Sequence, residues 1–452
     1  MSRRTAFSSL FLLLITALMI APAVAASHPA HSVVYPTGVF PDDVQNVQAA
    51  VDKGGVVLLK AVNVSGAPTS FNFSTDLAVA AVSGGINLTT DVTILGEHSG
   101  RARTTILGGF APILGLVPVK SSIQGIVFER PFDDAIQIAA STGTDVIGNY
   151  IHNVVPVKVR VGSGRIITFG DGIDVGSYGD NTGITGKVRV MGNVIDGLGA
   201  IFSNGVQFDT VGAESEVSGN VVVHLNSPDT ETGGGITLIR IQKPIVVSNN
   251  LIIPGASSMS DADGIFVGGD MGARYKVFSN FIYCDGTFAD GIDITGGDAT
   301  GTTGTFDAVI ANNFVTTKNA SSGAPIAVFD LVTNALIEGN FLFGDGYFAM
   351  GITTYGFETN TASLNRFVDN HLEGFSSSFA DIFFDANAEN NRVIGKCKSL
   401  VDLGTGNTST CGEAMKSAAA SETPQRLAGM QAKSRNLLQL QHVRPLVRTR
   451  IP

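Results

Sequence analysis

Residues 261 to 297 read DADGIFVGGDMGARYKVFSNFIYCDGTFADGIDITGG, and this stretch decides the fold. It contains the tripeptide Asp-Gly-Ile twice, beginning at Asp263 and again at Asp290. Between the two copies lies Asn280, with Val277 three positions before it and Ile282 two positions after it. Both features recur along the chain, so this stretch is one unit of an internal repeat.

The asparagine pattern is found repeatedly. Each copy has an apolar residue three positions before the asparagine and another two positions after it, and most copies are about 30 residues apart. The asparagines are Asn149, Asn193, Asn220, Asn250, Asn280, Asn313, Asn340 and Asn370. A repeat of this length indicates a solenoid in which each unit forms one coil. The longer interval between Asn149 and Asn193 predicts an inserted loop around residues 156 to 170.

The segments related to Asp-Gly-Ile have strand character. Their third and fifth residues are apolar and the residue between these is mostly polar, the period-two pattern of a strand with one buried face. The segments are DAIQI (134–138), DGIDV (171–175), NGVQF (204–208), GGITL (234–238), DGIFV (263–267) and DGIDI (290–294). We therefore expect the following side chains to point inward: Ile173, Val175, Val206, Ile236, Ile265 and Ile292.

Two or three short strands per unit, with no helical periodicity between them, predict an all-β fold, a parallel β-helix. Successive coils pair strand on strand at ~4.8 Å, so equivalent residues form ladders along the axis. The asparagines are interpreted as one such ladder, in which side-chain amides bind the backbone and one another inside a turn. We expect a single solenoid of about ten coils.

The segment FPDDVQNVQAAVDKGGVVLLK (40–60) resembles the helix and first strand that open right-handed β-helix proteins of the pectate-lyase-like (pectin lyase fold) superfamily. The resemblance continues through the repeats to about Cys411. It implies a single-stranded right-handed parallel β-helix with a short N-terminal capping helix over its open end. Because lyases, hydrolases, epimerases and non-catalytic proteins share this architecture, the resemblance is specific for fold and weak for function.

The chain divides into parts of different composition. The predicted parts are a signal peptide (1–25), an N-terminal cap with the first irregular coils (26–120), the parallel β-helix repeats (121–411) and a basic, disordered tail (412–452). The first part has an arginine pair, a short apolar run and a small-residue cleavage site, which indicate secretion to the extracellular space or periplasm. No other stretch is apolar enough for a membrane span.

Charge limits the partners. The formal net charge of the whole chain is -10, although the tail after Gly412 is basic, so the body is more acidic than the total. An acidic body repels nucleic acid and other polyanions unless a metal ion bridges them, which favours neutral glycans or metal-assisted binding. The chain has no Trp, so its 27 Phe and 7 Tyr would have to supply any sugar-stacking surface.

Three cysteines are present. Cys397 and Cys411 flank a short loop near the end of the repeats, and an oxidising compartment would allow a disulfide between them. Cys284 lies in a strand-like run and is interpreted as a small buried hydrophobic residue.

The two Asp-Gly-Ile copies supply the main candidate site. Stacking should place Asp263 and Asp290 about one coil apart, with Asp293 pointing outward and Asp261 at the edge, as a metal ligand. Clustered carboxylates raise one another's pKa or recruit a cation, so Asp263, Asp290 and Asp293 are candidate catalytic acids and bases, or a calcium site. The alternative is that an Asp before Gly only binds the backbone amides of its own turn.

The resemblance to the polygalacturonase branch offers further candidates. Asp171 or Asp290 would occupy the acidic position of its Asn-Thr-Asp motif, but the preceding Asn-Thr is missing and the chain has no Gly-His-Gly. The segment from Arg240 to Lys243 only echoes Arg-Ile-Lys, and the pair at 133 and 134 precedes DGIDV instead of following it.

A lyase would instead need a basic side chain and a calcium ion. Lys158 and Arg160 alternate with valines, so both should face outward from the inserted loop. The residues proposed to bind substrate are Asp171, Asp174, Lys158, Arg160 and Arg240. The favoured alternative is that Lys158 and Arg160 are ordinary solvated strand residues.

Two functions remain open at this stage. The first is a secreted β-helix that binds a polysaccharide, including a carbohydrate-active enzyme of the lyase or glycoside hydrolase type. The alternative is a non-catalytic structural or surface-interaction protein. Product analysis against neutral and acidic polysaccharides, with and without calcium, would separate them.

Overall fold

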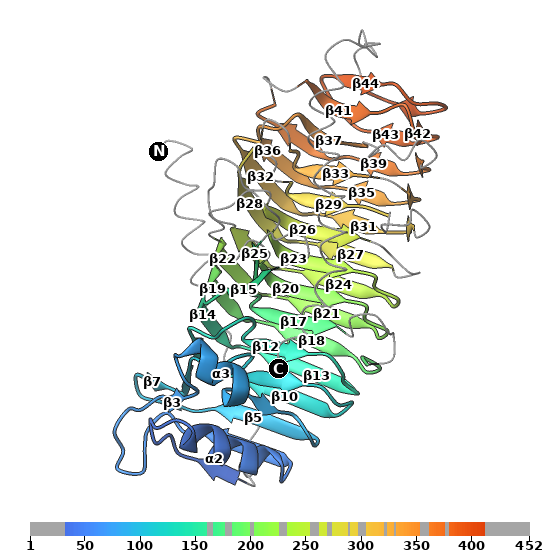
Figure 1. The fold of residues 1–452 in the computed structure, drawn as a ribbon. Coiled ribbons are helices and arrows are strands. Elements are labelled where there is room, and N and C mark those ends of the chain that lie inside the picture. The colour runs from blue at the N-terminus through green and yellow to red at the C-terminus, as the bar shows by residue number, and fades with distance from the viewer. Residues whose placement is uncertain are drawn as a thin grey trace.

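The computed structural model describes residues 32–411 except 161–165, 177–182, 199–202, 226–232, 254–261, 269–273, 288–289, 297–303, 321–322, 330, 353–360 and 376–378. Over this range the chain winds into one right-handed parallel β-helix, and strands of successive coils lie side by side in long sheets (Figure 1). The expected fold class is confirmed, and with it the resemblance in fold to the pectate-lyase-like proteins.

Each regular coil contributes one strand to each of three sheets. The first sheet, which carries the Asp-Gly-Ile segments, consists of β4 (Ile86–Asn87), β9 (Ile113–Gly115), β12 (Ile136–Ile138), β17 (Ile173–Gly176), β20 (Asn204–Asp209), β23 (Gly233–Ile239), β26 (Ala262–Gly268), β29 (Ile292–Ile294), β33 (Ile326–Val328), β37 (Phe348–Ile352), β41 (Ala380–Phe384) and β44 (Leu400–Asp402).

The second sheet precedes the asparagine ladder in each coil. It consists of β1 (Ser32–Val34), β2 (Gly55–Leu59), β5 (Val92–Gly96), β10 (Lys120–Gln124), β13 (Gly143–Ile147), β18 (Val188–Met191), β21 (Ser215–Ser218), β24 (Ile245–Ser248), β27 (Tyr275–Phe278), β31 (Val309–Ala311), β35 (Leu336–Glu338), β39 (Arg366–Val368), β43 (Arg392–Ile394) and β45 (Thr408–Ser409).

The third sheet follows the ladder. It consists of β3 (Phe71–Asn72), β8 (Thr105–Leu107), β11 (Val127–Glu129), β14 (Tyr150–Val154), β19 (Val194–Leu198), β22 (Val221–Leu225), β25 (Leu251–Ile253), β28 (Phe281–Asp285), β32 (Phe314–Lys318), β36 (Phe341–Gly344) and β40 (His371–Glu373). The three sheets have 12, 14 and 11 strands, so the solenoid has more coils than the ten expected.

Shorter sheets lie outside these three. The four-stranded sheet is formed by β30 (Thr305–Phe306), β34 (Val332–Thr333), β38 (Ala362–Ser363) and β42 (Ala388–Glu389), and the antiparallel pairs are β6 (His98–Ser99) with β7 (Ala102–Arg103) and β15 (Val157–Arg160) with β16 (Ile166–Phe169). The last pair is the inserted loop that the longer repeat predicted.

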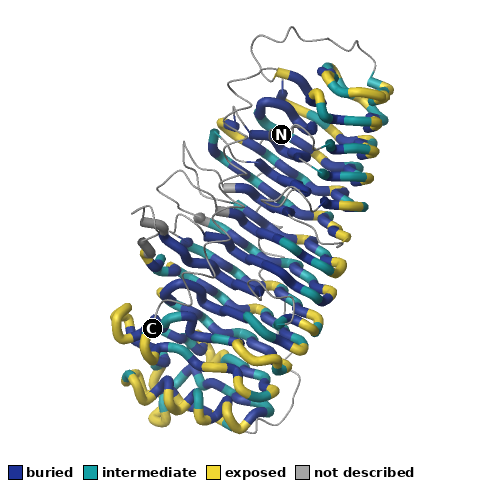
Figure 2. The backbone as a smooth tube through the Cα atoms, turned by 45° about the vertical axis from the view of Figure 1, so that its right-hand side comes forward, coloured by how far each residue is buried: buried dark blue, intermediate teal, exposed yellow. Residues whose placement is uncertain are grey.

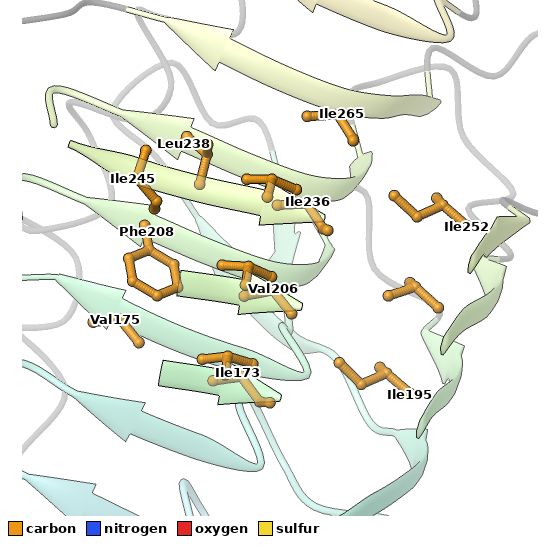
Figure 3. Close-up of a cluster of buried hydrophobic side chains, with 14 of the residues drawn as sticks. Ile173, Val175, Ile195, Val206, Phe208, Ile236, Leu238, Ile245, Ile252 and Ile265 are labelled. Atoms are coloured by element: carbon orange, nitrogen blue, oxygen red, sulfur yellow. The ribbon is translucent and has the colours of Figure 1, made fainter. Parts of the chain in front are cut away.

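The core fills the lumen of the solenoid. Ile173 pairs with Val206 and Val206 with Ile236, so apolar residues of equal register stack from coil to coil (Figure 3). All six side chains that were expected to point inward are fully buried in one continuous cluster. This cluster runs the length of the molecule beneath a more exposed outer surface (Figure 2).

The expected capping helix is α2 (Asp42–Val51), which packs Val44, Val47 and Val51 on the first coil. Its buried Asp43 accepts hydrogen bonds from the backbone amides of Thr37 and Asn72, at 2.7 and 2.8 Å, and so joins the cap to the solenoid. A second helix, α3 (Leu77–Ser83), was not expected.

The asparagine ladder is confirmed. In each turn the side-chain Nδ2 donates to the Oδ1 of the next asparagine at 2.9–3.0 Å. A second, shorter ladder of Asn365, Asn391 and Asn407 was missed. The predicted disulfide between Cys397 and Cys411 is present, and Cys284 is buried as expected.

The predicted signal peptide (1–25) and basic tail (412–452) lie outside the described residues. Among the residues that are described, no helix is long and apolar enough to cross a membrane.

Candidate functional site

Asp263, Asp290 and Asp293 converge beside two neighbouring strands of the first sheet. Asp293 lies between Ile292 and Ile294, both of which face the lumen, so strand alternation places its side chain on the opposite face. Asp263 lies in β26, and Asp290 precedes β29 on the next coil. One carboxylate oxygen from each lies within 4.8 Å of the other two. We call these three residues the second triad.

The backbone positions two of these carboxylates. The amide of Asp290 donates to Oδ1 of Asp263 at 3.1 Å, which confirms that the two residues stack one coil apart. The amide of Ala324 on the following coil donates to Oδ1 of Asp290 at 2.6 Å. Both residues therefore bind a backbone amide of the next coil, whereas the alternative expected them to bind amides of their own turn.

The motif has a small residue at its second position in each copy, and the structure shows why. A Cβ on Gly264 would lie 2.3 Å from Cγ2 of Ile282 on the third sheet and 2.4 Å from the carbonyl oxygen of Gly291. The glycine lets the first and third sheets approach closely at this corner, which brings the preceding aspartate to the outer face.

The second triad is closed off from solvent. Asp263 is 2% exposed, and Asp290 and Asp293 are 0% exposed. Asp293 was expected to point outward, and it does leave the lumen, but it is buried on that outer face. The face of a strand therefore did not fix the exposure of this side chain.

Burial controls the acidity of the three carboxyls. It raises the pKa of Asp290 to about 8, against the opposing effect of the amide of Ala324. Burial also raises the pKa of Asp263 and of Asp293 well above the usual value, and the neighbouring carboxylates add to both shifts. Such groups hold protons at a pH where ordinary aspartates are ionised.

An equivalent first triad lies nearer the N-terminus. Asp134, Asp171 and Asp174 also place one carboxylate oxygen each within 4.8 Å of the other two, and all are buried. The amide of Asp171 donates to Oδ1 of Asp134 at 3.0 Å. Sequence analysis assigned only Asp171 and Asp174 to a site. Alignment of DAIQI one coil before DGIDV would have identified Asp134.

The first triad has a polar side chain beside it on the next coil. Asn204 on the next coil donates to Oδ1 of Asp171 from its backbone amide at 2.7 Å and from Nδ2 at 3.3 Å. The equivalent residue beyond Asp290 is Ala324, whose side chain has no donor. The two triads therefore share geometry but differ in how the next coil satisfies them.

Two of the other candidate residues, Lys158 and Arg240, lie apart from the triads. Lys158 is exposed on β15, and Arg160 ends that strand. Arg240 is ion-paired with the buried Asp209, its Nε lying 2.9 Å from Oδ1. Asp261, the expected metal ligand, lies outside the described residues. The structure does not bring Lys158 or Arg240 into one site with the second triad.

A row of aromatic side chains on the outer face of the third sheet was missed. Its members are Phe281, Phe314, Phe341, Phe343 and His371, on β28, β32, β36 and β40. Phe281 and Phe314 stack at 4.8 Å between ring centroids, and Phe314 and Phe343 do the same. The signal was the residue after each ladder asparagine, which is Phe, Phe, Phe and His in four successive coils.

The far end of this aromatic row is open to solvent. Phe341 is 49% exposed, and its ring lies 5.7 Å from that of His371, tilted by 39°. Polar groups lie on the neighbouring coils of the same sheet. Asp285 pairs with Lys318 at 3.6 Å and accepts a hydrogen bond from Nδ2 of Asn319 at 2.7 Å.

Comparison with known proteins gives likeness in architecture. No family model and no curated protein matches the sequence. Among solved structures, the chain is similar to the A-module of the mannuronan C-5 epimerase AlgE6 of Azotobacter vinelandii, with a TM-score of 0.45, 13% identity and coverage of 83% of this chain and 97% of that one. It is also similar to the DFA-IIIase of Arthrobacter chlorophenolicus A6 without its lid, with a TM-score of 0.43, 12% identity and coverage of 87% and 98%.

Proposed function

We propose that this chain is a secreted β-helix protein that binds a polysaccharide along the outer face of its third sheet. The observation that carries the proposal is the aromatic row, and above all the exposed ring of Phe341. Aromatic rings offer large, rigid apolar surfaces on which the apolar faces of sugars pack. The disulfide near the end of the repeats is consistent with the oxidising environment of a secreted protein.

The shape of the row suits a polymer. Its rings come from successive coils, which repeat at ~4.8 Å along the solenoid axis. A linear chain of similar sugars can therefore make the same contact on several coils. Asp285, Lys318 and Asn319 lie beside the row and supply donors and acceptors for hydroxyl groups.

Charge favours a neutral polysaccharide over an acidic one. The formal net charge of the chain is -10, so a polyanion approaching the body is repelled. A neutral glycan meets no such barrier. We expect binding of neutral polysaccharides to change little with salt concentration.

Replacing Phe341 and Phe343 together by alanine should weaken polysaccharide binding by about tenfold or more, because each ring contact contributes on the order of 1 kcal/mol and ~1.4 kcal/mol is a factor of ten. The measurement is the dissociation constant for the tightest-binding member of a panel of soluble polysaccharides, by affinity electrophoresis or calorimetry.

Phe306→Ala is the matched control for this test. Phe306 is 48% exposed, nearly the same as Phe341, but it lies on β30 in a different sheet. The control should bind as the parent does. Equal affinities for the parent and the double variant would show that the aromatic row is not the binding surface.

A catalytic role for Asp263, Asp290 and Asp293 is a second candidate function, favoured by their proximity and raised pKa values. A carboxyl that keeps its proton near neutral pH can act as a general acid. Calcium, the expected cofactor, would occupy the same oxygens and instead stabilise negative charge on a uronate substrate. Joint replacement of the three aspartates by Asn should then abolish product formation while glycan binding by the aromatic row persists.

A further inference from the structure

Asp293 presents a polar group that the fold itself leaves unsatisfied. Its side chain is 0% exposed, and within the described ranges neither carboxylate oxygen has a hydrogen-bond partner. Burying a polar group without a partner costs free energy, and burying an isolated charge costs far more. A side chain in this position therefore requires a ligand that the described residues do not supply.

The charged groups around Asp293 increase the free-energy cost of burying its carboxylate. The groups that act on its carboxyl are Asp263 and Asp290, both acidic. Described neighbours on the outer face are Phe266 on β26 and Ala327 on β33, which are neutral and apolar. Cys284 donates from Sγ to the carbonyl oxygen of Asp290 at 3.5 Å, and its thiol carries no positive charge.

We propose that Asp263, Asp290 and Asp293 form a binding site for one divalent cation of the calcium class. Three carboxylates with oxygens within 4.8 Å of one another provide a compact set of oxygen ligands. Hard cations such as calcium take six to eight such ligands, and carboxylates supply them singly or in pairs. The ion would give both oxygens of Asp293 the partner that they lack.

Protonation alone does not give the carboxylate oxygens of Asp293 the partners that they lack. Protons neutralise the three carboxyls, but the oxygens of Asp293 remain without a hydrogen-bond partner among the described residues. A divalent ion removes most of the charge and also binds the oxygens directly. Cation and protons thus compete for the same atoms, and uptake of the ion should release protons.

The first triad provides a matched comparison within the same molecule. Asp174 occupies the same position in DGID as Asp293 and is also 0% exposed. In that triad, however, Asn204 on the next coil donates two hydrogen bonds to Asp171. We assign the cation to the second triad, because both oxygens of Asp293 lack a hydrogen-bond partner among the described residues.

The test is calorimetric titration of calcium chloride into the purified, metal-free protein at pH 8, with Asp293→Asn and Asp174→Asn as the two variants. The parent and the Asp174 variant should bind one calcium ion with equal affinity. The Asp293 variant should bind at least about tenfold more weakly, a loss typical of disturbing even the outer partners of a metal site. No heat of binding in the parent, or equal binding by the Asp293 variant, would overturn the proposal.

Thermal unfolding of the same proteins gives a second readout that does not depend on activity. Burial raises the pKa of Asp290 to about 8 and raises those of Asp263 and Asp293 as well, so for Asp290 the folded state binds more protons than the unfolded state between about pH 4 and about pH 8. The metal-free parent should lose stability as the pH rises through this window, and calcium should restore it most strongly at pH 8.

The Asp293→Asn variant distinguishes a lost ligand from a lost fold. Because it removes a buried carboxyl, it should be at least as stable as the metal-free parent at pH 8 and should gain little from calcium. A parent whose melting temperature at pH 8 is unchanged by calcium would contradict the site. The triad and the aromatic row lie on different sheets, so this result is independent of glycan binding.

Discussion

Replacing Asn250 by alanine is expected to lower the free energy of unfolding by about 4 kcal/mol, because it breaks the asparagine ladder at its centre. Oδ1 of Asn250 accepts hydrogen bonds from the backbone amide and Nδ2 of Asn220, at 2.9 and 3.0 Å. Its Nδ2 donates to the carbonyl oxygen of Val217 and to Oδ1 of Asn280. Alanine removes all four of these buried hydrogen bonds.

Urea unfolding followed by circular dichroism measures this loss. Asn87→Ala is the control, since Asn87 is exposed on β4, and it should change the free energy of unfolding by less than about 0.5 kcal/mol. If both variants unfold at the same urea concentration, the ladder contributes no net stability.

Replacing Gly235 by alanine should destabilise the protein by about 3 kcal/mol through overpacking. A Cβ at this position would lie 2.2 Å from Cγ2 of Ile252 and 2.6 Å from the carbonyl oxygen of Gly264. Ile252 is fully buried in the core, and the carbonyl belongs to the next coil, so neither atom can move away without disturbing a stacked neighbour.

Gly115→Ala is the comparison for Gly235→Ala. Gly115 lies on the same sheet, but its nearest obstacle is Cδ1 of Ile138 at 3.1 Å, the flexible end of a side chain. Its melting temperature should fall less than that of the Gly235 variant. The reverse order would show that the close approach of the first and third sheets is not what requires glycine at position 235.

The fold was predictable because the stacked coils repeat their chemistry. Each ladder asparagine satisfies the same backbone groups in the next coil, so the pattern around Asn280 had to recur wherever a coil did. The predicted number of coils was too low because the first coils lack the asparagine pattern on which it was based. β5 and β9 stack with the later strands, for example, but no ladder asparagine lies between them.

Some short helices and strands have too weak a sequence pattern to be predicted. The helix α3 (Leu77–Ser83) is short, and its sequence, LAVAAVS, also alternates as a strand would. Its beginning is fixed by Asp76, whose side chain accepts a hydrogen bond from the amide of Ala78 at 2.9 Å. Such a cap is visible in sequence only when the following residues have helical periodicity.

The candidate site was predictable in part. Register alone placed Asp263 beside Asp290, because equal motifs stack on adjacent coils. It could not show that Asp293 is buried, since exposure depends on what covers the outer face and not on strand alternation. The aromatic row was missed because the repeat pattern includes the asparagine and the lumen-facing apolar residue two positions after it. The aromatic residue lies between these two positions and is not part of that pattern.

The central claim is that the outer face of the third sheet binds a polysaccharide. Hydrogen–deuterium exchange of the purified protein, with and without the tightest-binding member of a panel of neutral and acidic polysaccharides, tests it most directly. The account predicts that a neutral member binds and slows exchange in β28, β32, β36 and β40. Absence of binding across the panel, or protection confined to the other two sheets, would contradict it.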